Sequence, residues 1–359
     1  MRAPILLLAS ILSLGSARTA AETASADSSS SLWRHNNLVA WCVVPFDARK
    51  RGPEERAKML QGLGFRHFAY DWREKDVPTF DAEIDAAHEF GIEILAWWFP
   101  LDAEDPMAMT ILETFKRHNI HPQLWDPFFP PTMPMTAAQW VKVMPAGYHW
   151  PKTPEELARL SDKEKAEMKL QMGTALLQLR REDLTMTADG QVLRVDKEAD
   201  RIRRLEELAK PYGCMVELYN HNGWLGMAEN QLAVIEKLRQ LGVNDVGMVY
   251  NFSHSRDELH DDSANFPALW RKIEFHVVNV NITGMHMDGD YIYPSQGNGE
   301  LEMMRTIQES GWNGTVGLDA EKGLDAQITL QNYLRGLDWI AAELKQAGSA
   351  GPRPLFQPP

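Results

Sequence analysis

The sequence has little cysteine, no surplus of basic residues and no long apolar run after its first residues. Two cysteines among 359 residues exclude a disulfide framework and a zinc site made of cysteine alone. Because Cys42 and Cys214 fall in separate apolar segments, we expect two buried free thiols. Lys and Arg number 37 against 50 Asp and Glu, a net charge of −13 that disfavours nucleic acid as a partner. An acidic globular enzyme or small-molecule binder remains.

The first residues predict an export signal. Met1-Arg2 precedes an apolar run to Leu14, and small residues follow at Gly15-Ser16-Ala17. This order is typical of a secretory signal peptide, and the run is too short to span a bilayer. We therefore expect residues 1–21 to be removed, residues 22–37 to be flexible, and the mature protein to be secreted or periplasmic. No membrane span is expected after removal of the signal.

Short apolar segments alternate with amphipathic ones over residues 38–347. Eight βα pairs predict an α/β fold, a closed (β/α)8 TIM barrel rather than an open sheet. The first turn, Val44-Pro45-Phe46-Asp47, lacks the glycine-rich phosphate loop of dinucleotide-binding sheets. Residues 348–359 contain four prolines and predict an extended surface tail. The predicted strands are Leu38–Val44, Arg66–Asp71, Ile92–Phe99, Ile120–Trp125, Met215–Asn220, Val246–Asn251, Phe275–Ile282 and Thr315–Asp319.

A long insertion after the fourth strand, about residues 126–195, interrupts this alternation. Because it follows a strand, we expect it over the C-terminal face of the barrel, either as a surface decoration or as a lid on the substrate pocket. Its last part, Thr185–Val195, has Asp189-Gly190 at its centre and predicts a small hairpin. The next helix is expected to begin near Asp196. The other helices are expected to begin near Pro53, Phe80, Pro106, Met227, Ala264, Glu300 and Gln327.

Polar and aromatic residues gather where the predicted strands end. In this type of barrel the active site is built from those ends. A single His or Asn there could cap a helix, but convergence from at least five strands is hard to explain by capping. Amides, carboxylates and aromatic rings suit a carbohydrate, whose hydroxyls need fixed partners and whose apolar faces stack on Trp. The expected substrate-binding residues are Asp71, Trp98, Tyr219, Asn220, Trp224, Asn251, Asn281 and Glu321.

At these strand ends the chain resembles the sugar phosphate isomerase/epimerase family, the xylose isomerase-like TIM barrels. The segments that carry the resemblance are Leu218–Trp224, Val249–His254, Val278–Met285 and Ser295–Glu300. It covers most of the chain except the insertion. It is closest to exported or uncharacterised members with a Tyr-Asn-His-Gly-Gly-Trp-like motif. The resemblance implies a barrel fold and sugar isomerase or epimerase chemistry.

The resemblance also implies a divalent metal, Mn²⁺, Mg²⁺, Zn²⁺ or Co²⁺, but the usual ligand set is incomplete. The metal-dependent members use Glu, Asp, His and Glu on strands five to eight, with a further His on strand six. Here those four positions fall on Tyr219, Asn251, Asn279 or Asn281, and Asp319, and the further His is His254. Neutral amides are poor ligands for these ions. The ligands, if a metal binds, would be Glu217, His254 and Asp319, and a site without metal stays equally open.

Two classes of function fit these residues. The first is an enzyme that isomerises or epimerises a non-phosphorylated sugar or keto-sugar derivative. The reaction would proceed by abstraction of a proton next to the carbonyl. A lyase or hydrolase acting on keto-glycosides is its alternative. The catalytic candidates are His221 or His254 as base, Glu217 or Asp319 as the second acid/base group, and Asn251 and Asn281 as donors to the enolate oxygen. The second class is a non-catalytic exported carbohydrate-binding barrel. A homo-oligomer is compatible with either.

Overall fold

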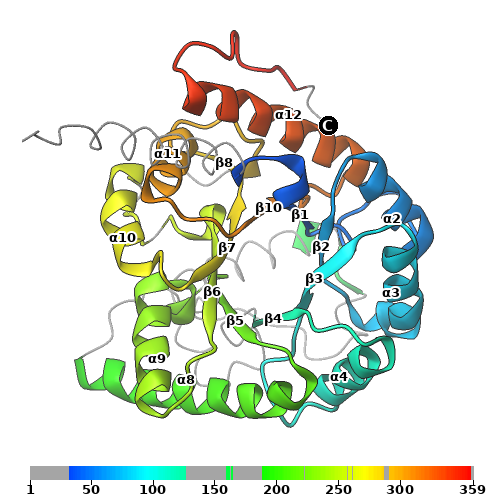
Figure 1. The fold of residues 1–359 in the computed structure, drawn as a ribbon, viewed down its shortest axis with the longest axis vertical. Coiled ribbons are helices and arrows are strands. Elements are labelled where there is room, and N and C mark those ends of the chain that lie inside the picture. Colours follow the sequence, from blue (N-terminus) through cyan, green and yellow to red (C-terminus); the bar gives the residue numbers. More distant parts are fainter. Residues whose placement is uncertain are drawn as a thin grey trace, which may run out of the picture.

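The computed structural model describes residues 32–126, 159–161, 163–164, 188–221, 223–256, 258–260, 262–286 and 291–356. In this part of the chain eight parallel strands close into a barrel, and eight α-helices form a ring around them (Figure 1). The predicted (β/α)8 TIM barrel is therefore confirmed. The expected export signal, residues 1–21, and most of the insertion lie outside the described residues.

The strands follow one another around the barrel in chain order, and the last one, β10, closes against β1. They are β1 Leu38–Trp41, β2 His67–Tyr70, β3 Glu93–Trp98, β4 Gln123–Asp126, β5 Val216–Tyr219, β6 Gly247–Asn251, β7 Val277–Ile282 and β10 Thr315–Asp319. Trp41 pairs with Asp319, so the C-terminal ends of β1 and β10 lie side by side. A two-stranded ribbon, β8 Gly284–Met285 with β9 Tyr291–Ile292, forms a separate sheet.

The helices begin mostly where local signals predict. They are α2 Pro53–Gly62, α3 Phe80–Glu89, α4 Pro106–His118, α8 Ala188–Ala209, α9 Ala228–Gln240, α10 Phe266–Ile273, α11 Glu300–Ser310 and α12 Ala326–Lys345. Pro53 opens α2 with acidic residues behind it, and the Asp105 side chain accepts a hydrogen bond from Met107 N at the start of α4. Proline fits the first turn, and a carboxylate satisfies backbone N–H groups that have no helical partner.

The start of α8 corrects one prediction. Residues from Ala188 onward are helical, so the expected hairpin over Thr185–Val195 is wrong from that point, and the helix starts well before Asp196. The buried residues Ala199, Ile202 and Leu205 recur at helical spacing and face the barrel. That apolar face outweighs the local Asp-Gly turn signal.

The segments that flank the barrel pack against it. Leu32 and Trp33 are buried, and Nε1 of Trp33 donates to Gln308 of α11 at 2.8 Å. The start of the described part of residues 22–37, which were expected to be flexible, therefore packs against the barrel. After α12 the tail returns along the molecule, where Gln296 Nε2 donates to Pro354 O at 2.8 Å.

Aromatic side chains fill the interior of the barrel. Trp41 and Trp125 contact each other with ring centroids 4.8 Å apart, and Trp125 stacks on Tyr219. Trp98 packs on Trp41 from the end of β3, whereas the neighbouring Trp97 packs toward the helices. This opposition follows from the alternation of side chains along a strand.

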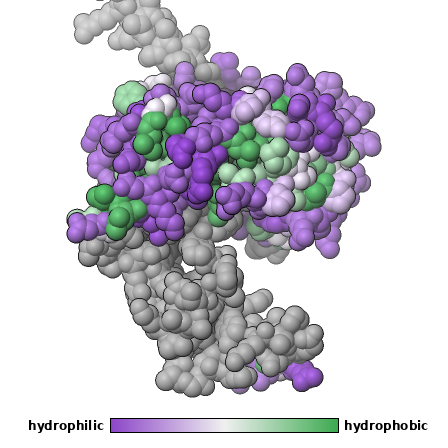
Figure 2. Space-filling model, turned by 90° about the horizontal axis from the view of Figure 1, so that it is seen from below, coloured by the Kyte–Doolittle hydropathy of each residue, from purple (hydrophilic) through white to green (hydrophobic). Residues whose placement is uncertain are grey.

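The outer surface is polar. Figure 2 shows hydrophilic residues over most of the visible described surface, with smaller hydrophobic groups between them. None of the described helices is long and apolar enough to cross a membrane. Cys42 and Cys214 are both buried free thiols, as predicted.

Candidate active site at the strand ends

Four of the predicted site residues keep some exposure at the C-terminal ends of the strands. These are Trp98 after β3, His221 after β5, His254 after β6 and Glu321 after β10. All the other predicted site residues are almost fully buried. A ligand at this mouth therefore meets the two histidines, one carboxyl group and one indole ring first.

The two histidines form a pair. Their rings lie 4.6 Å apart at an angle of 84°, and both rings also contact Tyr219. Nδ1 of His254 lies 3.0 Å from the backbone oxygen of Asn220. Because a carbonyl oxygen only accepts, this nitrogen carries the proton, and the lone pair of the neutral ring is on Nε2. The backbone thus sets the tautomer of His254.

A hydrogen-bond network centred on Tyr219 forms the floor beneath this pair. The phenolic oxygen accepts hydrogen bonds from Nδ2 of Asn251 at 2.6 Å, Nε1 of Trp41 at 3.1 Å and Nδ2 of Asn281 at 3.4 Å. The amide of Asn281 also bonds the amide of Asn279 at 2.8 Å. Each of these side chains is at most 1% exposed. The side-chain amides of Asn251 and Asn281 are therefore already hydrogen-bonded within this network. The prediction that they hold an enolate oxygen is not supported.

The same network bears on the metal that the family resemblance implies. Tyr219, Asn251 and Asn281 stand at three of the four ligand positions, and N–H groups converge where a cation needs oxygen or nitrogen lone pairs. These residues do not fit a divalent metal at the usual place. The alternative ligands also stay apart, since Glu217, His254 and Asp319 do not form a close group in the described part of the chain.

A cluster of acidic groups lies at the ends of β1, β2 and β10. Burial raises the pKa of Asp71 to about 8 and that of Asp319 to about 6. Burial and the charge of Asp319 together raise the pKa of Glu321 to about 7. The carboxylate of Asp319 is oriented by Glu321 N, which donates to it at 2.9 Å, and by the side chains of Cys42 and Asn251.

Cys42 reaches this cluster because of its backbone. It has a φ of 52°, which ends β1 at Trp41, and its side chain packs with the barrel interior, as that of Trp41 does. A regular strand would turn two successive side chains to opposite sides. Burial and the charge of Asp319 raise the pKa of the Cys42 thiol well above its ordinary value.

Three predicted site residues have structural roles instead. Asn220 connects the end of β5 to β6. Its side chain accepts a hydrogen bond from Asn251 N at 2.6 Å and donates one to Asn251 O at 3.2 Å. Trp224 is buried in the core, and its indole donates to Gln191 of α8 at 2.6 Å. Glu217 lies below the floor, two residues before Tyr219, and burial raises its pKa to about 8. None of the three faces the mouth, so contact with a ligand is not supported.

The sequence reasoning missed Trp41 and Cys42. Trp41 binds the Tyr219 oxygen, and Cys42 bonds the Asp319 carboxylate. The position of Trp41 at the end of the first predicted strand is a signal in the sequence for the tryptophan. No sequence signal predicts that a cysteine takes a positive φ there.

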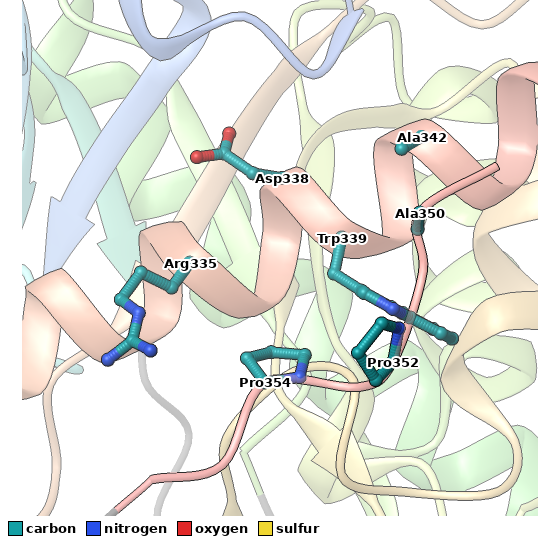
Figure 3. Close-up of a pocket in the computed structure, with 7 residues that line it drawn as sticks. All are labelled: Arg335, Asp338, Trp339, Ala342, Ala350, Pro352 and Pro354. Atoms are coloured by element: carbon teal, nitrogen blue, oxygen red, sulfur yellow. The ribbon is translucent and has the colours of Figure 1, made fainter.

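A pocket of about 390 Å³ lies elsewhere, between the exposed face of α12 and the C-terminal tail (Figure 3). Arg335, Asp338 and Trp339 line it from the helix, and Pro352 and Pro354 line it from the tail. It contains none of the residues at the strand ends.

No known family model matches the chain, and no curated protein matches it. Among solved structures, D-psicose 3-epimerase with D-tagatose from Clostridium cellulolyticum H10 is 12% identical, with a TM-score of 0.45. The match covers 86% of this chain and 96% of the epimerase chain. A xylose isomerase-like TIM barrel protein from Mycobacterium smegmatis in complex with magnesium is 13% identical, with a TM-score of 0.46, and covers 89% and 98%. A xylose isomerase domain protein from Planctomyces limnophilus is 12% identical, with a TM-score of 0.49, and covers 86% and 96%. At these values the likeness says nothing about function, which has to be inferred from the site.

Proposed function

We propose that the protein is a sugar isomerase- or epimerase-like enzyme that abstracts a proton next to the carbonyl of its substrate. The observation that carries this proposal is the histidine pair. Two partly exposed imidazole rings lie 4.6 Å apart at the mouth of the barrel, and the backbone sets the tautomer of one of them. Neutral imidazole is an effective general base near neutral pH.

His254 is the base in this proposal, because its Nε2 carries the lone pair of the neutral ring. His221 is the second group, and it returns the proton to the neighbouring carbon or gives one to the oxygen. Both rings belong to adjacent strand ends, so they act from one side of the substrate. Two groups on one side suit proton transfer between adjacent atoms, as in aldose–ketose isomerisation or β-elimination. Inversion at a single carbon needs groups on both faces and is supported less well.

The remaining exposed residues suit a polyhydroxylated ligand. The indole of Trp98 offers a flat apolar surface, held in place by Trp41 at a centroid distance of 5.0 Å. Glu321, which follows β10, provides a carboxyl group for sugar hydroxyls. That the sugar is not phosphorylated rests on the predicted export signal, since sugar phosphates are made inside cells.

The test is a panel of free aldoses, ketoses and keto-glycosides incubated with the wild-type protein and with His254→Gln. We expect one member of the panel to be converted, and the variant to lose roughly 10²–10⁴-fold in kcat while binding within a few-fold of wild type. His35→Gln is the matched control, because His35 precedes β1 at the opposite end of the barrel and pairs with Asp338. It should leave turnover unchanged.

Saturable sugar binding without conversion of any member would contradict the enzyme proposal. It would favour the non-catalytic carbohydrate-binding barrel. Equal turnover of His254→Gln and wild type would remove His254 as the base.

A further inference from the structure

β1 and β10 lie side by side in the barrel (Figure 1). Three side chains of metal-ligand type meet where these two strands end. Sγ of Cys42 and one carboxylate oxygen each of Asp319 and Glu321 lie within 4.8 Å of one another. No other three His, Cys, Asp or Glu side chains come this close in the part of the chain that the structure describes. Ligand atoms around one zinc ion, at about 2.0–2.3 Å from the metal, are roughly 3–4 Å apart. Small rotations would therefore bring these three onto a single ion.

A second observation is the neighbouring carboxyl group of Asp71, which is 1% exposed. Its Oδ1 accepts from Val44 N at 3.2 Å, so the group is held beside the segment that carries Cys42, and its charge acts on the thiol. Its Oδ2 is buried and has no hydrogen-bond partner among the described residues. Leaving a polar oxygen of a carboxyl group buried and unpartnered is costly, and a cation close by would favour the ionised form of the group.

Cations lie near this cluster. The charges of Arg73 and Lys322 act on Glu321. Nη1 of Arg73 is bound to the backbone oxygens of Asp71 and Trp72. Arg73 is therefore held by the backbone beside the cluster.

We propose that Cys42, Asp319 and Glu321 bind one Zn²⁺ ion at the mouth of the barrel. A thiolate among the ligands favours Zn²⁺ or Co²⁺ over Mg²⁺ and Ca²⁺, which prefer oxygen. On binding, the bond from the thiol to its proton is exchanged for the bond to the metal, and the proton passes to solvent. The hydrogen bond from Glu321 N to Asp319 keeps that ligand oriented.

This site differs from the one that the family resemblance implies, with which it shares only Asp319. Three protein ligands, of which Glu321 is partly exposed, match the pattern of catalytic zinc sites rather than that of closed structural ones. The inference does not rest on the proposed function, because the ion would bind whether or not the histidines do chemistry.

The test is a titration of the chelator-treated, reduced full-length protein with Co²⁺. A cobalt–thiolate bond gives a charge-transfer absorption in the near ultraviolet, and we expect this band to saturate at one Co²⁺ per chain. Competition with Zn²⁺ should remove it. Cys42→Ser should lose the band. Cys214→Ser is the matched control and should keep it, since Cys214 is also a buried free thiol and its Sγ bonds Tyr212 O outside the cluster.

Glu321→Gln provides a second variant in case Cys42→Ser does not fold, because this side chain is partly exposed. It should keep the cobalt–thiolate band but weaken Zn²⁺ binding by roughly tenfold or more. Absence of the band in the wild type, its persistence in Cys42→Ser, its loss in Cys214→Ser, or unchanged Zn²⁺ affinity in Glu321→Gln would each overturn the proposal. Failure of the sugar panel would not affect these readouts.

Discussion

At the scale of single residues, the division between exposed and buried groups decides what the strand ends can do. His221, His254, Glu321 and Trp98 remain accessible, and Tyr219, Asn251 and Asn281 are tied to one another below them. Both sets consist of residue types that bind sugars. In the function proposed above, the first set contacts the ligand and the second supports the site.

The floor network leads to a prediction about Tyr219→Phe. Removing the phenolic oxygen leaves the Asn251 amide and the Trp41 indole without their buried acceptor. We expect the free energy of unfolding to fall by about 2–4 kcal/mol, measured by denaturant titration. Tyr212→Phe is the control, because its hydroxyl bonds Glu113 in a partly buried place, and it should cost less than about 1 kcal/mol. Equal losses in both variants would mean that the network adds nothing.

The residue types at the strand ends were predictable from the sequence, but how deeply each side chain is buried was not. Alternation along β5 places Glu217 and Tyr219 on the same inner side, and it does not tell which of them a ligand reaches. The hydrogen bonds of Asn220 to β6 depend on the pairing of two strands, which appears only in the closed barrel. Cys42 escaped prediction because its position depends on one backbone angle.

At the scale of elements, periodicity predicted more than local turn signals did. All eight strands overlap their predicted segments, because buried parallel strands are short apolar runs between helix boundaries. The error at α8 arose where Asp189-Gly190 resembles a hairpin turn, while the apolar face that decides the helix lies further along, at Ala199 and Ile202.

The close approach of β10 to β7 gives a prediction at this scale. A Cβ at Gly317 would overlap Oδ1 of Asn281 on the paired strand. We expect Gly317→Ala to lower the free energy of unfolding by about 1–3 kcal/mol, because the packed interior has to shift. Gly62→Ala in α2 meets no atom within 4 Å, and it should leave stability unchanged or raise it by up to about 1 kcal/mol. A neutral Gly317→Ala in the same thermal or denaturant series would contradict this packing.

At the scale of the whole molecule, buried carboxyl groups make stability depend on pH. Burial raises the pKa of Glu217 to about 8 from an ordinary value of 4.5. The folded state therefore keeps a proton that the unfolded chain loses. The resulting stabilisation is complete below pH 4.5 and is lost as pH rises through 8.

Glu217→Gln removes this titration. Between pH 5 and 8 the decline in unfolding free energy should become shallower than in wild type, by up to about 1.4 kcal/mol per pH unit. Denaturant titrations at several pH values measure the two slopes. Parallel slopes for variant and wild type would show that Glu217 has the same pKa in the folded and the unfolded state.

In the proposed reaction the histidine pair moves a proton next to a sugar carbonyl, and hydrogen exchange with the solvent is the direct test of this step. The protein is incubated in D₂O with the sugar that the panel identifies, and the hydrogen on the carbon next to the carbonyl is followed by NMR. We expect wild type to exchange or transfer this hydrogen with turnover, and His254→Gln to do so roughly 10²–10⁴-fold more slowly. Conversion at the same rate in both proteins, or a bound sugar that never exchanges in wild type, would contradict it.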